Sequence, residues 1–167
     1  MSTSAAAGDG CCCRCTTTTV SPETVTGSHV FVVQGYSKSK GALGVGRCVY
    51  SGTFAVGGHI WCIGYYPDSA REEHAEYISF CLHADPTMAV EEVTARYVFS
   101  LLDQAGQAVA QYRRSSGTWK TFSRTDGATW RGVHLMTRDE LESSPHLRDD
   151  SFRIQCDVTV FKDLRRE

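Results

Sequence analysis

The sequence predicts an all-β fold, an antiparallel β-sandwich with one short helix. Three observations support this fold class. Short runs alternate between apolar and polar residues with a period of two, turn residues separate these runs, and one segment carries a helix signal. With 167 residues, the chain is long enough for one hydrophobic core and too short for two ordinary ones.

Seven runs have the composition of β-strands. They cover residues 29–36, 47–54, 59–66, 77–82, 94–102, 108–113 and 152–160. The first is rich in β-branched and aromatic residues, and Gly57 and Gly58 end the second. The third ends at Pro67, and three large apolar residues share one of its faces: Trp61, Ile63 and Tyr65. A charged loop, residues 68–75, leads to the fourth.

The last three runs alternate more regularly. The fifth places four apolar residues on one face: Ala95, Tyr97, Phe99 and Leu101. A turn at residues 103–106 returns the chain into the sixth run as a hairpin. A polar segment, residues 115–129, contains Trp119 and Phe122. The seventh run then presents one apolar face, which predicts a strand buried on one side: Phe152, Ile154, Cys156, Val158 and Val160.

One helix is predicted just before the last run. Thr137 and Glu140 fit a capping box, in which the hydroxyl and the carboxylate satisfy free N–H groups of the first helical turn. The helix ends near Ser143 because Pro145 follows and cannot continue it.

The composition excludes several classes of protein. A formal net charge of -2 argues against non-specific nucleic-acid binding. No apolar stretch approaches the roughly 18 residues of a membrane helix. The N-terminus lacks the basic and apolar regions of a secretory signal, which predicts an intracellular protein, in the cytoplasm or the nucleus. Residues 1–24 have low complexity, and we expect them to form a disordered tail.

The chain contains 8 cysteines, and half of them crowd into residues 11–15. Cys12 and Cys15 have the C-x-x-C spacing, but zinc needs about four ligands and no second pair is present. We therefore expect no metal site and no cofactor. A domain of this size builds a core without disulfides, so we expect the remaining four to be reduced. These are Cys48, Cys62, Cys81 and Cys156.

No motif indicates an enzyme. The chain has no Gly-x-Ser-x-Gly elbow and no signature of a catalytic cysteine. The Gly-rich segment 41–46 lacks the Lys-Ser/Thr pair and the strand–helix context of a phosphate-binding loop. We interpret this segment as a turn between strands.

Nine short segments stand in a characteristic order along some four-fifths of the chain. They are residues 27–31, 35–37, 51–54, 57–58 together with 61, 76–79, 93–99, 130, 137–139 and 156–160. In this order they resemble the MATH (meprin and TRAF homology) family, above all the plant BTB/POZ–MATH proteins of the speckle-type POZ protein-like group. The resemblance implies a TRAF-like, eight-stranded antiparallel β-sandwich at residues 25–163. Residues 164–167 then end the chain without a BTB domain.

The resemblance also implies a function. Domains of this family hold a short, extended, Ser/Thr-containing peptide of a client protein in a shallow groove. We therefore expect a protein-interaction module, the substrate-recognition part of a cullin-RING ubiquitin ligase adaptor. A cullin would bind only through a BTB domain, which is absent from this chain. The alternative is a stand-alone MATH protein that competes for clients or serves as a structural or self-association module.

Three aromatic residues match positions of the family groove, namely Tyr97, Phe122 and Trp130. Aromatic residues of this kind often carry the binding energy of an interface, although all three also suit core or rim packing. Their match to the groove predicts direct contact with the peptide.

Four further positions depart from the family pattern. The family's Trp-Gly-Phe run reads Trp130, Arg131 and Gly132 here, and Cys81 replaces a groove tyrosine. Asp126 lies in a loop that is about two residues longer, and both Asp126 and Arg131 could add charge-assisted contacts. We expect the same binding mode and a different peptide.

Overall fold

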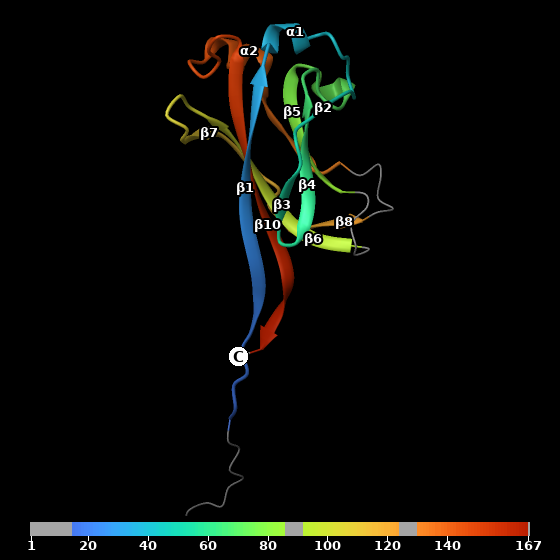
Figure 1. Ribbon diagram of the computed structural model, residues 1–167, viewed down its shortest axis with the longest axis vertical. Helices are drawn as coiled ribbons and strands as arrows, with labels where there is room; N and C mark the ends of the chain where they lie inside the picture. Colours follow the sequence, from blue (N-terminus) through green and yellow to red (C-terminus); the bar gives the residue numbers. More distant parts are fainter. Residues whose placement is uncertain (1–14, 86–91, 124–129, 167) are drawn as a thin grey trace, which may run out of the picture.

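The structure, a computed structural model, describes residues 15–85, 92–123 and 130–166. Two antiparallel β-sheets pack together, and short helical segments lie at one end of the sandwich (Figure 1). The helical segments are α1 (Tyr36–Ser39), the short 3-10 helix η1 (Glu72–His74) and α2 (Arg138–Ser143). The structure confirms the all-β sandwich that the sequence predicts.

Five strands form the first sheet, sheet A. They are β1 (Val20–Gln34), β6 (Glu92–Leu102), β7 (Ala108–Ser115), β8 (Lys120–Ser123) and β10 (Ser151–Arg166). Their order is β1–β10–β6–β7, and β8 pairs with the first half of β6. The long strands β1 and β10 pair along their whole length, and one end of this pair projects from the sandwich as a two-stranded ribbon (Figure 1).

Five shorter strands form the second sheet, sheet B. They are β2 (Val49–Tyr50), β3 (Phe54–Val56), β4 (His59–Tyr66), β5 (Tyr77–Ala84) and β9 (Gly132–Thr137). Their order is β2–β4–β5–β9, and β3 also pairs with β4. Gly57 and Gly58, both with positive φ, make the tight turn between β3 and β4.

The core lies between the sheets and consists of the alternating residues that the sequence pattern predicts. All five predicted core residues of β10 are at most 2% exposed. Aromatic rings fill the centre, where Phe80 packs against Tyr65, Phe99 and Phe152 with centroid distances of 5.2, 6.0 and 6.4 Å. Full burial of one such ring stabilises the fold by about 1.5–3 kcal/mol.

The predicted strand at residues 47–54 is two short strands, β2 and β3. Ser51 interrupts the ladder between them. Its N–H donates to the carbonyl oxygen of Ile63 over 2.8 Å, and its Oγ accepts the N–H of Ile63 over 2.9 Å. A side-chain oxygen thus replaces the backbone acceptor that would have continued the strand.

Three further differences concern strands and helices that the sequence pattern does not show. β8 and β9 were not predicted, and α1 and η1 occupy segments that we expected to be loops. β1 begins at Val20, although residues 20–24 were assigned to the tail, because β10 pairs with this segment. Residues 1–14 of the predicted tail lie outside the described residues.

The Gly-rich loop after α1 is held by a buried carboxylate. Asp68 is 7% exposed, and its two oxygens accept the N–H groups of Gly41 (2.7 Å) and Gly44 (2.9 Å). Arg138 lies 3.9 Å from the same carboxylate. The loop's N–H groups therefore bind a group of the protein itself, which agrees with its interpretation as a turn.

Helix α2 begins with the predicted capping box. Oγ1 of Thr137 accepts the N–H of Glu140 over 3.1 Å, and Oε1 of Glu140 accepts the N–H of Thr137 over 3.2 Å. Leu141 is fully buried and fixes the helix to the core.

The substitution Thr137→Ala is expected to lower the free energy of unfolding by about 1 kcal/mol, because the N–H of Glu140 loses its acceptor. Thr137→Ser keeps the hydroxyl and is expected to unfold close to the original protein. Chemical denaturation measures both variants. An equal loss of stability in both would contradict the capping role of the hydroxyl.

Candidate peptide-binding face

The outer face of sheet B presents three rows of residues, of which two cross β4, β5 and β9 and the third crosses β4 and β5. These side chains alternate with core residues, and the antiparallel register places them opposite one another. The first row is Tyr66, Ser79 and His134, the second is Gly64, Cys81 and Gly132, and the third is Cys62 and His83. We call the second row the small-residue row, since it lies low between two rows of larger side chains.

Aromatic rings lie over the two glycines of the small-residue row. A Cβ atom on Gly132 would lie 2.6 Å from Cζ2 of Trp130, and one on Gly64 would lie 3.0 Å from Nε2 of His83. The glycines therefore leave the space that these two rings occupy. Cys81, between the glycines, is 3% exposed, and burial raises the pKa of its thiol to about 12. The Cys81 thiol is consequently protonated, and unreactive as a nucleophile, at neutral pH.

Trp130 is half-buried and packs on two rings of the first row. It stacks on His134 with a centroid distance of 5.8 Å and an interplanar angle of 17°, and it meets Tyr66 edge-on at 5.4 Å. His134 is fixed in turn by Ser79, whose Oγ lies 2.8 Å from Nδ1 of the imidazole, and by the His74 ring at 4.2 Å. These contacts hold the Trp130 ring against the sheet.

The electrostatic environment favours the uncharged form of His134. Burial lowers the pKa of His134, and the nearby side chains of His74 and Arg71 lower it further. The imidazole beneath Trp130 is therefore neutral at pH 7. A neutral ring with one nitrogen bonded to Ser79 gives this part of the face hydrogen-bonding groups without a fixed charge.

Arg131 connects the start of β9 to sheet A. Its Nη2 and Nε donate to the carbonyl oxygen of Thr121 over 2.9 and 3.2 Å, and its guanidinium lies 5.9 Å from the centre of the Phe122 ring. Arg131 stands between Trp130 and Gly132 in the chain, so these contacts help to position both. Its contact with a peptide stays a prediction.

Two of the three predicted aromatic wall residues lie in the core instead of on the surface. Tyr97 and Phe122 are 2% and 5% exposed and belong to the core cluster. Oη of Tyr97 donates to the carbonyl oxygen of Gly132 over 3.5 Å, and Phe122 meets Trp61 edge-on at 5.1 Å. Tyr97 thus supports β9 from beneath. Among the three, Trp130 alone is available to a ligand on this face.

The loop residue Asp126 lies outside the described residues, so its predicted contact also stays a prediction. Cys81 faces outward as the resemblance implies, beneath the rings described above. The described cysteines are free thiols.

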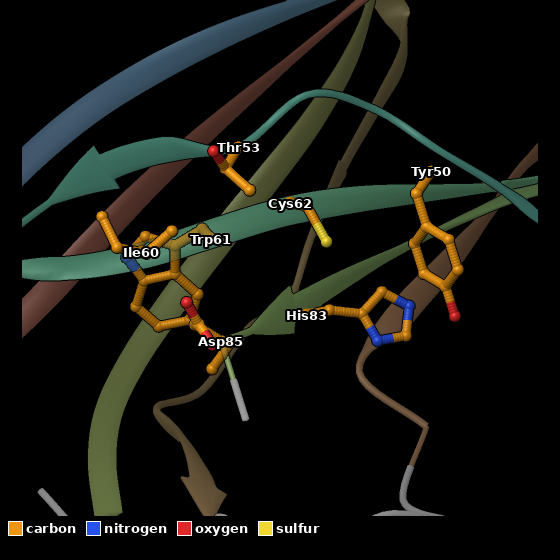
Figure 2. A pocket seen from close by; sticks show the side chains of 8 residues that line it. Tyr50, Thr53, Ile60, Trp61, Cys62, His83 and Asp85 are labelled. Atoms are coloured by element: carbon orange, nitrogen blue, oxygen red, sulfur yellow. The ribbon is translucent and has the colours of Figure 1, made fainter. Parts of the chain in front are cut away.

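A pocket of about 490 Å³ opens where β2 borders this face (Figure 2). Its lining residues are Tyr50, Thr53, Ile60, Trp61, Cys62, His83, Ala84 and Asp85. Figure 2 shows Cys62 between two groups of side chains, with Tyr50 and His83 on one side and Ile60 and Asp85 on the other. The outer face therefore has two distinct parts. One is the Trp130 region near β9, formed by Trp130, Tyr66 and His134, and the other is the pocket at β2.

The described ranges contain neither a candidate metal site nor a candidate membrane-spanning helix. Within residues 15–85, 92–123 and 130–166, no group of three His, Cys, Asp or Glu side chains is placed to hold a metal ion. In the same ranges, no helix is long and apolar enough to cross a membrane.

Comparison with known proteins identifies the fold. The sequence profile of the MATH domain family matches residues 28–158, which is more than half of the chain. The chain belongs to the MATH family. The MATH domain is a protein-interaction fold and not an enzyme, and it binds protein partners.

Two curated relatives come from Arabidopsis thaliana. BTB/POZ and MATH domain-containing protein 6 is 37% identical over 145 residues, which cover 83% of this chain and 34% of that protein. BTB/POZ and MATH domain-containing protein 4 is 36% identical over 153 residues, which cover 87% of this chain and 32% of that protein. This MATH chain therefore spans about a third of the length of these relatives.

A solved structure shares the fold of this MATH domain. TRAF5 from Notothenia coriiceps superimposes with a TM-score of 0.52 and 15% sequence identity, over 79% of this chain and 72% of that one. At this identity the likeness concerns the fold alone.

Sequence reasoning missed four residues on the outer face of the MATH domain: Tyr50, Tyr66, His83 and His134. The period-two pattern of β4 already placed Tyr66 on the face opposite Trp61, and that signal could have found it. His134 had no assigned face because β9 was not predicted. His83 and Tyr50 come together only through the pairing of β2 and β5 with β4.

Proposed function

We propose that this MATH domain binds a short, extended, Ser/Thr-containing peptide of a client protein across the outer face of sheet B. Trp130 carries this proposal. Its ring is held by Tyr66 and His134 yet stays partly exposed, beside the small-residue row. Extended peptides bind to surfaces that offer flat aromatic walls and nearby hydrogen-bonding groups. The partly exposed imidazole of His134, held through Nδ1 by the buried Ser79, provides such a group.

We further propose that the domain serves, inside the cell, as the substrate-recognition part of a cullin-RING ubiquitin ligase adaptor. Two relatives that carry both BTB/POZ and MATH domains in their names support this setting. In such an adaptor the cullin binds through the BTB domain. The MATH domain would bind the client alone.

A random peptide library tests the binding proposal directly. The immobilised chain is expected to enrich one short motif that contains small hydroxyl residues. If repeated selections enriched no motif, the binding proposal would fail, and a structural or self-association module would be favoured. A separate mixture with a cullin is expected to show no stable complex unless a BTB domain is supplied. Direct cullin binding by this chain would contradict the proposed division of labour.

Trp130→Ala is expected to weaken binding of the selected peptide by roughly 1–3 kcal/mol, since the aromatic wall is lost. The melting temperature should change little because the ring is only half-buried. Trp119→Ala is the matched control: Trp119 is 37% exposed and packs on Arg96 and Phe161 of sheet A. Fluorescence polarisation measures the affinity of all three proteins. Equal effects of the two substitutions would refute a specific role of Trp130.

A further inference from the structure

The pocket at β2 is chemically different from the Trp130 region. Asp85 is the one lining residue that carries a charge at neutral pH. Burial lowers the pKa of His83, so its imidazole is neutral at pH 7. Nε2 of His83 is buried and has no hydrogen-bond partner among the described residues, and this arrangement also disfavours a charged ring. The ionisable acid of the lining is thus Asp85, whose carboxylate also has contacts within the protein.

The walls of the pocket suit a long, flexible side chain. Tyr50 and Ile60 are 58% and 39% exposed, so each offers an apolar surface to a ligand. The Tyr50 ring is fixed by the edge of His83, with a centroid distance of 5.3 Å and an interplanar angle of 73°. Between the walls the floor is formed by the small side chain of Cys62 (Figure 2).

We propose that this pocket receives a lysine or arginine side chain of the client peptide. The inference rests on the proposed function, because the pocket adjoins the face on which the peptide is expected to bind. The methylene groups of the side chain pack between Tyr50 and Ile60, above Cys62. The cationic head is then attracted by the Asp85 carboxylate.

The carboxylate of Asp85 favours a basic side chain in the pocket over an apolar or an acidic one. An apolar side chain that filled the pocket would remove water from Asp85 without supplying a donor, which is unfavourable. An acidic side chain would be repelled. A carboxylate has about four acceptor positions, so Asp85 can keep its contacts within the protein and still accept a bond from the ligand.

The experiment starts with the motif selected from the peptide library, which is expected to have Lys or Arg at one fixed position. Affinities are measured for this peptide and for the same peptide with norleucine at that position. Asp85→Asn is expected to weaken the basic peptide about 10-fold. The norleucine peptide should lose no affinity and can gain some, because a neutral amide costs less to desolvate than a carboxylate. Glu23→Gln is the control, since it removes one negative charge from the exposed ribbon of β1.

A second variant distinguishes a loss of peptide binding from a loss of folded structure caused by Asp85→Asn. Ile60→Arg places a cation at the wall of the pocket, where the side chain is already 39% exposed. It should weaken the basic peptide at least as much as Asp85→Asn, with a melting temperature near that of the original protein.

The possible failures are distinguishable. A selected peptide that loses affinity with Trp130→Ala but not with Asp85→Asn or Ile60→Arg would overturn the basic subsite and leave the proposed function standing. A selected motif without a basic residue would do the same. If no peptide bound at all, the proposed function would fail and the subsite with it.

Discussion

Replacement of Trp61 by alanine is expected to lower the free energy of unfolding by about 3–5 kcal/mol. Trp61 is 0% exposed, and its ring meets Phe122 edge-on at 5.1 Å, so the substitution opens a cavity where the two sheets meet. Its Nε1 also donates to the carbonyl oxygen of Val56 over 3.2 Å. A loss of this size is a large part of the roughly 5–15 kcal/mol of a typical domain.

Chemical denaturation, followed by circular dichroism, measures this loss. Trp61→Phe helps to separate its two causes, since phenylalanine keeps one ring in the core but removes the donor to Val56 and part of the ring volume. It is expected to cost about 1–2 kcal/mol, the usual cost of a missing hydrogen bond with some loss of volume. If Trp61→Ala were as stable as Trp61→Phe, the packing between Trp61 and Phe122 would not contribute as the structure indicates.

Gly132→Ala is expected to destabilise the domain by about 3 kcal/mol and to weaken peptide binding. A Cβ atom on Gly132 would collide with the carbonyl oxygen of Phe80 and would lie 2.9 Å from Cα of Cys81, both in the backbone of β5. It would also lie 2.6 Å from Trp130. Backbone atoms of a central strand cannot move aside cheaply, so the start of β9 must shift and the Trp130 ring with it.

Two other glycines provide graded controls for this substitution. On Gly64, a Cβ atom would meet Nε2 of His83 at 3.0 Å, which is the end of a side chain that can turn away. On Gly52, it would meet no heavy atom within 4 Å. The loss of stability should therefore fall in the order Gly132→Ala, Gly64→Ala, Gly52→Ala. Equal stability of the three variants would show that β9 can shift without cost.

The same geometry bears on specificity. Gly132 and Cys81 stand where the family resemblance led us to expect aromatic groove residues. The Trp130 ring occupies the space over Gly132, and the His83 ring lies over the neighbouring Gly64. The proposed binding face is thus built from a different set of side chains on the same fold. This supports the expectation of a peptide unlike the family's usual one.

The core was predictable because burial on one face of a strand imposes a strict period of two. Trp61, Ile63 and Tyr65 of β4 are all at most 2% exposed, as their alternation predicts. The helix was predictable because the capping box of Thr137 and Glu140 is a local arrangement. Short strands with mixed composition, such as β8 and β9, left no such pattern, because their pairing partners stabilise them.

The sequence was a poorer guide to which aromatic residues lie in the core and which lie on the surface. Tyr97 and Phe122 suit both settings, and only the packing of the sheets placed them inside. The row of Gly64, Cys81 and Gly132 joins residues from three strands, and the register that aligns them is a property of the assembled sheet.

The sequence by itself determined the fold class, the family and the buried face of each long strand, because these depend on local periodicity and on the order of short motifs. The tertiary structure alone decided which rings cover the small-residue row and that Tyr50, Cys62, His83 and Asp85 line one pocket. The physical reason is that strand pairing brings together residues far apart in the chain, and neither composition nor spacing encodes which neighbours they meet.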